Sequence, residues 1–308
     1  MTDKKHIKLW RILAYSVLGF IFLIALLAWG GNAALERLKV IEPISAVIFF
    51  GVTVIVSGIT AIRWGLLTNL IAGKKVCDYF TYYFYFLINR TLGLTLMPQS
   101  AADFVLRPLM LRFNHDTTVT QVAGGVIVDR LIDVVLLMMS ILPAILYLAG
   151  AINTLGFWII LTLLIGLSGL SILWLLRWNI FNRWEKIANQ INRVTANPTA
   201  LYWIIIFSIA RFFLISLQFY LAAAIFQVEL SWTQIAVALP AAQLIAILAF
   251  TPGAIGFREG GFTGAFLLMD IGQEVIQAYV VLQRLLITVT IAILTCIVAI
   301  AFFVRKAL

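Results

Sequence analysis

Five arginines lie inside stretches of the chain that are otherwise apolar enough to span a membrane: Arg90, Arg130, Arg211, Arg258 and Arg284. An arginine at the bilayer centre costs roughly 3 kcal/mol on insertion scales, so each side chain must face protein, water or an anion rather than lipid. We therefore expect these arginines to face the inside of a helix bundle, where an anionic substrate could neutralise them.

The composition predicts a polytopic membrane protein. Hydrophobic residues make up 63% of the 308 residues and charged residues only 11%, whereas soluble domains carry about 25% charged residues. At roughly 20 apolar residues a crossing, this length allows about six to eight membrane helices and no soluble catalytic domain. The two cysteines, Cys77 and Cys296, lie far apart and far from His6 and His115, so we expect no disulfide framework, no metal site and no cofactor.

The net charge of +9 indicates an orientation in the membrane rather than a nucleic-acid partner. Most loop cations can lie on one side, while Arg37 and Lys39 lie on the other side with the loop acids. Because basic loops face the cytoplasm, the basic side and both termini are predicted to be cytoplasmic. The cations assigned to that side are Lys4, Lys5, Lys8, Arg11, Arg63, Lys74, Lys75, Arg107, Arg112, Arg177, Arg183, Lys186, Arg193, Arg305 and Lys306.

Uncharged runs predict an all-α fold in a single membrane domain, residues 1–308. Each of two further segments begins and ends on one side of the membrane. They are interrupted at Pro98 and Pro252, where a backbone N–H is missing, so we expect two re-entrant helical hairpins. An apolar face over residues 178–194 predicts an amphipathic interfacial helix, which could anchor a connector to the headgroups or offer a surface to a partner. The six predicted full crossings are residues 12–35, 43–62, 121–149, 157–176, 200–226 and 275–304.

A proline-to-arginine spacing occurs twice in the chain. Arg130 follows Pro98 by 32 residues, and Arg284 follows Pro252 by the same number. The first hairpin is predicted to enter from the cytoplasm and the second from outside, so the two units would form an inverted repeat. Inverted repeats with broken helices are typical of transporters, whose substrate site lies near the midplane. The two hairpin-plus-helix units are residues 76–149 and 233–305.

Two interpretations remain open for the arginines that follow the hairpins. Arg130 shares a helix with Asp129 and Asp133, so the three could neutralise one another, or Arg130 could bind substrate while the two carboxylates relay protons. Arg284 has no acid within a helical turn. It could pair with a distant acid such as Glu259 or Asp133, or its planar guanidinium could clamp a phosphate or carboxylate.

The second break is rich in glycine, including Gly253 and Gly256. These glycines could expose backbone N–H groups to an anion, or they could allow close helix packing. Arg258 and Glu259 are adjacent, so their side chains diverge on a helix and would pair with other elements; Asp103 and Arg107 could do the same. The residues predicted to bind substrate are Arg90, Arg130, Arg211, Arg258, Glu259 and Arg284.

Four stretches of the chain resemble the lysylphosphatidylglycerol synthase transmembrane region, a flippase-like family: residues 98–107, Asp129-Arg130, residues 251–261 and Arg284. The resemblance covers nearly the whole chain. Of the two motifs at the helix breaks, residues 251–261 form the more specific one. In the other, Gln99 to Asp103 stand where the family pattern has a glycine-rich run with glutamate.

This resemblance implies a bacterial inner-membrane protein that moves a lipid between leaflets, with an aminoacylated phospholipid, another anionic lipid or an isoprenoid-linked lipid as its substrate. A lipid-synthesising enzyme or a second copy of the chain could be a partner. In the synthases of this family a soluble domain follows the membrane region, but this chain stops at Leu308, so we expect transport rather than synthesis. The alternatives are an integral-membrane enzyme acting on a lipid-linked sugar or isoprenoid phosphate, and an accessory subunit of a lipid-modifying enzyme.

Overall fold

The computed structural model describes residues 28, 31, 34–115, 117–177, 192–249 and 251–307, and within these residues the regular structure is entirely helical. Most of the first predicted crossing, 12–35, and of the predicted interfacial helix, 178–194, lies outside the described residues. Among the described residues, four helices are long and apolar enough to cross a membrane. They are α2 (Pro43–Ala72), α6 (Val119–Leu148), α9 (Pro198–Ile225) and α12 (Gln273–Ala307).

Helix α2 is longer than the sequence predicts. It begins after Glu42, whose carboxylate accepts hydrogen bonds from the backbone N–H groups of Ile44 and Ser45, and it ends 30 residues later at Gly73. The predicted end at residue 62 is therefore wrong. Arg63 lies inside the helix with no exposed surface, because carboxylates of other helices neutralise it there, and it is not a cytoplasmic loop residue.

The two broken segments lie where the prolines predict them. In the first, α3 (Tyr79–Thr95) ends before Pro98, and α4 (Gln99–Ala101), a π-helical stretch (Ala102–Leu106) and α5 (Arg107–Asn114) follow. In the second, α10 (Trp232–Ile247) is followed by a 3-10 turn (Pro252–Ala254) and α11 (Phe257–Leu267).

The second break is shorter than the glycine-rich run that predicts it, because residues 257–261 are already helical. Gly261 serves close packing here. A Cβ at this position would lie 2.5 Å from the Cα of Ala242 in α10, so only glycine lets α10 and α11 approach this closely.

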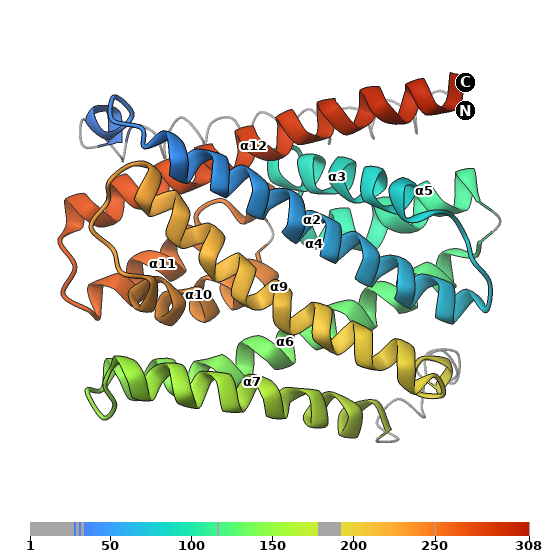
Figure 1. Ribbon diagram of the computed structural model, residues 1–308, viewed down its shortest axis with the longest axis horizontal. Helices are drawn as coiled ribbons and strands as arrows, with labels where there is room; N and C mark the ends of the chain where they lie inside the picture. Colours follow the sequence, from blue (N-terminus) through green and yellow to red (C-terminus); the bar gives the residue numbers. More distant parts are fainter. Residues whose placement is uncertain are drawn as a thin grey trace, which may run out of the picture.

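The helices of the two broken units pack across one another. Helix α3 packs against α12, α10 packs against α6, and α2 packs against α9, while α7 (Thr154–Arg177) covers α6 from outside (Figure 1). The two breaks meet inside the bundle, where the backbone N–H of Gly253 donates to the carbonyl oxygen of Met97 at 3.2 Å.

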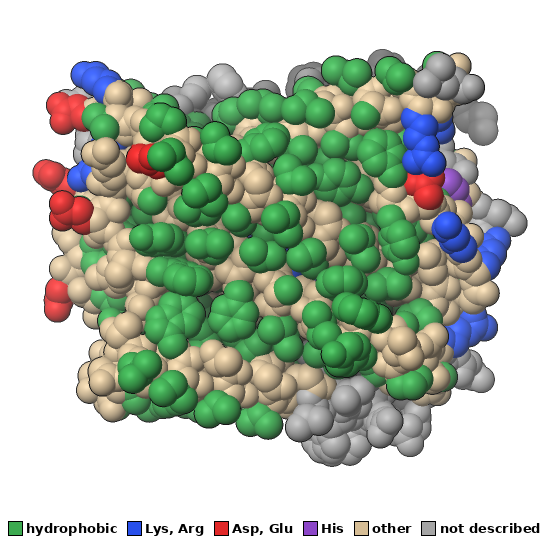
Figure 2. Space-filling view, viewed as in Figure 1, with side chains coloured by type: hydrophobic (Ala, Val, Ile, Leu, Met, Phe, Trp, Pro, Cys, Tyr) green, Lys and Arg blue, Asp and Glu red, His purple; other side chains and the backbone are tan. Residues whose placement is uncertain are grey.

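The two broken units approach this meeting point from opposite ends of the molecule. In Figure 1, α3 and α5 lie toward one end and α10 and α11 toward the other. Lys and Arg gather at the end that holds α3, Asp and Glu gather at the opposite end, and the face between them is mainly hydrophobic (Figure 2). Exposed charges include Lys74, Lys75, Arg305 and Lys306 on the basic side and Glu229, Asp270 and Glu274 on the acidic side.

Candidate functional site

A cavity of about 280 Å³ lies between the two broken segments and the long helices. Its wall includes Gln99 and Ser100, which follow the first break, and Ala246, Ile247 and Arg258, which flank the second. Apolar side chains of α2, α9 and α12 complete the wall. The elements that the two prolines interrupt therefore bring polar groups from distant parts of the chain to one space inside an apolar bundle.

Arg63 anchors an ion-pair network beside this cavity. Its Nη2 lies 2.7 Å from Asp129 Oδ1 and 2.8 Å from Asp133 Oδ1, and its Nη1 donates to Ser208 Oγ at 2.9 Å. All of these groups are buried. A buried cation with two carboxylates is strongly stabilised only while both partners remain, so the network ties α2 to α6 and α9.

Asp133 is the most heavily paired carboxylate of the network. Besides Arg63 it contacts Arg211 Nη1 at 2.7 Å and Arg130 Nη1 at 3.4 Å. The predicted pair between Arg130 and Asp133 within one helix therefore exists, but the closer partners of Asp133 come from other helices. Asp133 also lines a smaller cavity of about 60 Å³ that shares Arg130 and Arg211 with the main one.

Arg107 and Asp103 extend the network into the first broken segment. Arg107 Nη2 lies 2.8 Å from Asp103 Oδ1, Arg107 Nη1 lies 3.5 Å from Asp129 Oδ2, and Arg130 is in close contact with the second oxygen of Asp103. The guanidinium of Arg107 also lies 5.1 Å from the ring centre of Trp64. Arg107 is 1% exposed, so its assignment to a cytoplasmic loop is wrong; its acidic partners make burial possible.

Arg284 and Glu259 form a separate cluster at the point where the two breaks meet. Arg284 Nη1 donates to the carbonyl oxygen of Gly253 at 2.8 Å, and Nη2 donates to that of Leu94 at 3.4 Å. Glu259 lies 3.5 Å from Arg284 and accepts a hydrogen bond from the backbone N–H of Gly256. Arg284 therefore joins the two broken segments, and neither it nor Glu259 lies among the residues that line the cavity.

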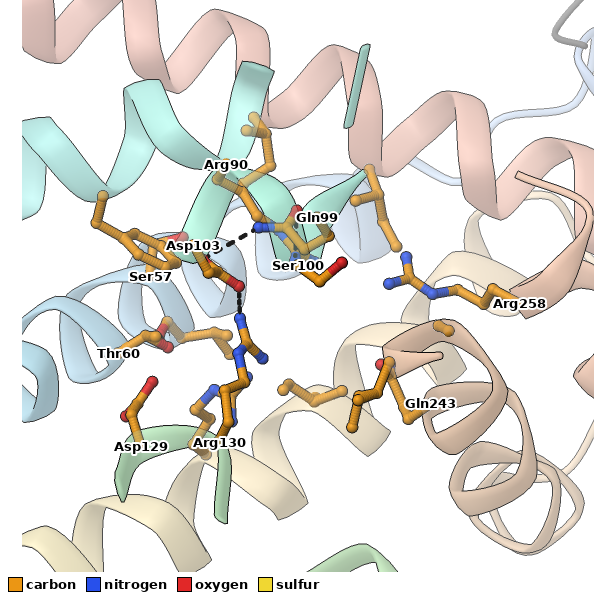
Figure 3. A pocket seen from close by; sticks show the side chains of 18 of the residues that line it. Ser57, Thr60, Arg90, Gln99, Ser100, Asp103, Asp129, Arg130, Gln243 and Arg258 are labelled. Carbon is orange, nitrogen blue, oxygen red and sulfur yellow. Dashed lines mark hydrogen bonds and ion pairs between the residues drawn. The ribbon is translucent and has the colours of Figure 1, made fainter. Parts of the chain in front are cut away.

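Within the described residues, two arginines of the cavity wall form no ion pair with a carboxylate. Arg258 is only 4% exposed, yet it makes no hydrogen bond or ion pair within the part of the chain that the structure describes, and its Nε is buried without a partner. Arg90 has a single hydrogen bond, to Gln99 Oε1 at 3.4 Å, and its main charge interactions are repulsive ones with other arginines. Figure 3 shows Arg90, Arg130 and Arg258 around a shared open space.

The structure thus brings together four of the six residues predicted to bind substrate, Arg90, Arg130, Arg211 and Arg258. Asp129 lines the same cavity, and its predicted role in a proton relay with Asp133 stays a prediction. Whether the four arginines bind substrate is likewise a prediction that these contacts do not test. No group of three or more His, Cys, Asp or Glu side chains that could hold a metal occurs within the described residues.

Sequence reasoning did not assign Arg63 and Arg107 to the site. A signal for Arg63 is present in the polar residues that precede it: Ser57 and Thr60 lie three residues apart, at the spacing of one helical face, and both line the cavity. A signal for Arg107 is also present, because Asp103 precedes it by four residues, at the spacing of one helical face; its other partner, Asp129, lies 22 residues away on another helix.

No curated protein and no solved structure matches this chain. The family model described as the lysylphosphatidylglycerol synthase TM region does match, over residues 9–295, which include every residue of the cavity wall. The chain therefore belongs to the lysylphosphatidylglycerol synthase transmembrane-region family.

Proposed function

We propose that this chain is a lipid flippase or transporter, which binds the headgroup of an anionic, aminoacylated or isoprenoid-linked lipid in the cavity while the lipid chains remain in the bilayer. The observation that carries the proposal is the pair Arg90 and Arg258, two arginines that form no ion pair with any described carboxylate and that line a cavity inside an apolar bundle. Such groups are costly in a membrane protein and mark substrate pathways. An anionic headgroup would supply the missing partner.

We also infer that residues 76–149 and 233–305 form an inverted repeat. Three features support this: the same order of broken segment and long helix, the approach of the two broken segments from opposite ends, and reciprocal packing in which α3 contacts α12 and α10 contacts α6. A two-fold relation in the membrane plane accounts for all three. Transporters with such repeats expose a site at the repeat interface to each side in turn by moving one unit against the other.

The orientation follows from the exposed charges. The end that holds α3 carries exposed Lys and Arg, so it would face the cytoplasm of a bacterial inner membrane, and the acidic end would face outside. The C-terminal end of α12 lies on the basic side. A separate lipid-synthesising enzyme would then supply the substrate on the cytoplasmic side.

Transport fits the cavity better than catalysis does. The carboxylates of its wall, Asp103 and Asp129, each contact two arginines. An enzyme acting on a lipid-linked sugar or phosphate would need a carboxylate free to accept a proton or bind a metal, whereas these two are engaged by guanidinium groups. We therefore favour transport over catalysis.

Headgroup translocation in proteoliposomes that contain only this purified chain tests the proposal. A labelled lipid is placed in one leaflet, and its arrival in the other is measured by chemical quenching. Hydrogen bonds to charged groups contribute about 1.5–3 kcal/mol, so Arg90→Gln and Arg258→Gln should each slow transport about tenfold or more. Arg112→Gln, which changes an exposed arginine of α5, is the matched control and should leave the rate unchanged.

Wild-type rates in both Gln variants would refute the cavity as the headgroup site. An absence of transport by the purified wild-type chain, with transport restored by a partner enzyme, would instead make the chain an accessory subunit.

A further inference from the structure

The charges in and around the cavity do not balance. Of the described side chains there, seven are arginines and four are carboxylates, which leaves three positive charges in excess. The carboxylates Asp103, Asp129 and Asp133 hold four arginines, Arg63, Arg107, Arg130 and Arg211, so that network carries one positive charge more than it neutralises.

The other two positive charges are those of Arg90 and Arg258. Arg284 does not add to the excess, because Glu259 lies beside it. Arg90 belongs to α3 of the first broken segment, and Arg258 is the second residue of α11 in the other. An anion between Arg90 and Arg258 would therefore be bound from two directions.

Among the described residues, the cavity wall also lacks a carboxylate that is free of arginine and could pair with a cationic headgroup. Both carboxylates in its wall are held by arginines, and the remaining polar groups, such as Gln99, Gln243 and Ser57, are uncharged. A lysyl ammonium group would enter a region of excess positive charge without a partner. Its burial would cost several kcal/mol, as for any unpaired ion.

The size of the cavity favours a small headgroup. Its volume of about 280 Å³ is at or below the lower end of the range for small-molecule sites, roughly 300–1,000 Å³. A terminal phosphate fits this space with room to spare, whereas a glycerol and an amino acid beyond the phosphate would have to share it.

We propose that the site selects a phosphomonoester, a terminal phosphate with no group esterified beyond it, over phosphodiester headgroups and over headgroups that carry an ammonium. This inference rests on the proposed function and narrows its substrate class. A phosphomonoester carries about −1.5 to −2 charges at pH 7 and three free oxygens. It matches two opposed guanidinium groups, each able to bind two oxygens, whereas a diester offers one charge and two free oxygens.

The test compares three lipids with identical acyl chains in nanodiscs that hold the full chain: phosphatidic acid, phosphatidylglycerol and lysylphosphatidylglycerol. Lipid retained by the protein is measured by native mass spectrometry. We expect phosphatidic acid to be retained at least tenfold over lysylphosphatidylglycerol and several-fold over phosphatidylglycerol. Equal retention of the three lipids, or preferential retention of the lysyl lipid, would overturn the inference.

Two further measurements separate this charge match from general affinity for anionic lipids. The second phosphate pKa is about 6, so at about pH 5 phosphatidic acid carries one charge and its advantage over phosphatidylglycerol should fall toward one. A persistent advantage at that pH would contradict the inference. Competition by millimolar inorganic phosphate distinguishes a site for a lipid headgroup from a site for free phosphate. Inorganic phosphate should displace little phosphatidic acid from a lipid site and most of it from a site for free phosphate.

A variant that adds one carboxylate should change the selectivity. Gln243→Glu places a negative charge in the cavity wall at nearly constant volume. We expect the preference for phosphatidic acid over the lysyl lipid to fall at least fivefold, whereas Glu229→Gln, an exposed change on the acidic side, should leave it unaltered. An unaltered preference in Gln243→Glu would contradict the charge argument. The wild-type ranking and its pH dependence decide the question even if this variant fails to fold.

The outcomes also separate this inference from the proposed function. Selective retention of phosphatidic acid without translocation would support the substrate class and refute the transport proposal. Translocation of the lysyl lipid at the higher rate, with loss in Arg258→Gln, would support transport and refute the substrate class.

Discussion

Substituting Gly253 by alanine should destabilise the whole bundle, because this residue lies where the two broken segments meet. Its φ of 60° is left-handed, which costs a residue with a Cβ roughly 1–2 kcal/mol. A Cβ would also lie 2.5 Å from the carbonyl oxygen of Leu94 and would collide with the guanidinium of Arg284. At least one of the two hydrogen bonds that Arg284 donates there must then break, at a cost of about 1.5–3 kcal/mol.

Together these terms give a loss of roughly 3–5 kcal/mol. At about 2 °C per kcal/mol, the midpoint of thermal unfolding in detergent should fall by roughly 6 °C or more. Gly260→Ala is the matched control, because Gly260 lies in the same segment, inside α11, with nothing within 4 Å of an added Cβ. Alanine favours a helix over glycine by roughly 1 kcal/mol, so this control should unfold at the same or a higher temperature.

An equal midpoint for the two alanine variants would refute the reasoning. It would mean that the two breaks are not joined through Gly253 and Arg284, and the inverted arrangement proposed for the two units would lose its central contact.

Two further predictions concern stability away from this junction. Asp133→Asn removes a carboxylate that three arginines share, so it should reduce the free energy of unfolding by about 3–5 kcal/mol in denaturant titrations. Asp270→Asn at an exposed turn should change the free energy of unfolding by no more than about 0.5 kcal/mol. Similar losses in the two variants would contradict the ion-pair network. Burial and the nearby Lys306 lower the pKa of His115 below its ordinary value of 6.5. The folded protein is therefore stabilised by neutral His115 above about pH 6.5, and this stabilisation is lost as the pH falls below about 6.5. His115→Gln should therefore show a smaller drop in unfolding temperature between about pH 7.5 and about pH 5.5, and an unchanged drop would exclude His115 as its source.

The sequence predicts the breaks and the long helices because their causes are local. Pro98 and Pro252 each lie in an interruption between helices, and the crossings predicted over 121–149, 200–226 and 275–304 agree with helices α6, α9 and α12 to within a few residues. The exact length of the second break is not local. It depends on the approach of Gly261 to Ala242, which becomes visible only once α10 and α11 are packed.

The ion-pair network could not be predicted in the same way. In the sequence, Arg63 and Arg107 look like other loop arginines and lie near basic residues, so the positive-inside rule assigns them to cytoplasmic loops. Their partners Asp129 and Asp133 lie at least 22 residues away in sequence, on a helix that the fold brings beside them, whereas Asp103, the other partner of Arg107, lies four residues before it. Arg284 illustrates the same limit: of the two interpretations open from sequence, its contacts with Gly253 and Leu94 favour a structural role, and a role in binding substrate stays a prediction.

The excess of arginine in the cavity is too costly to serve stability alone. At roughly 3 kcal/mol for each uncompensated cation in a membrane interior, Arg90 and Arg258 together amount to about 6 kcal/mol. That figure is comparable to the whole free energy of folding of a typical domain, about 5–15 kcal/mol. The ion-pair network does not need Arg90 or Arg258, since neither contacts its carboxylates. Glutamine at either position would fold at a lower cost, so the charge at these two positions supports the proposal that an anion binds there.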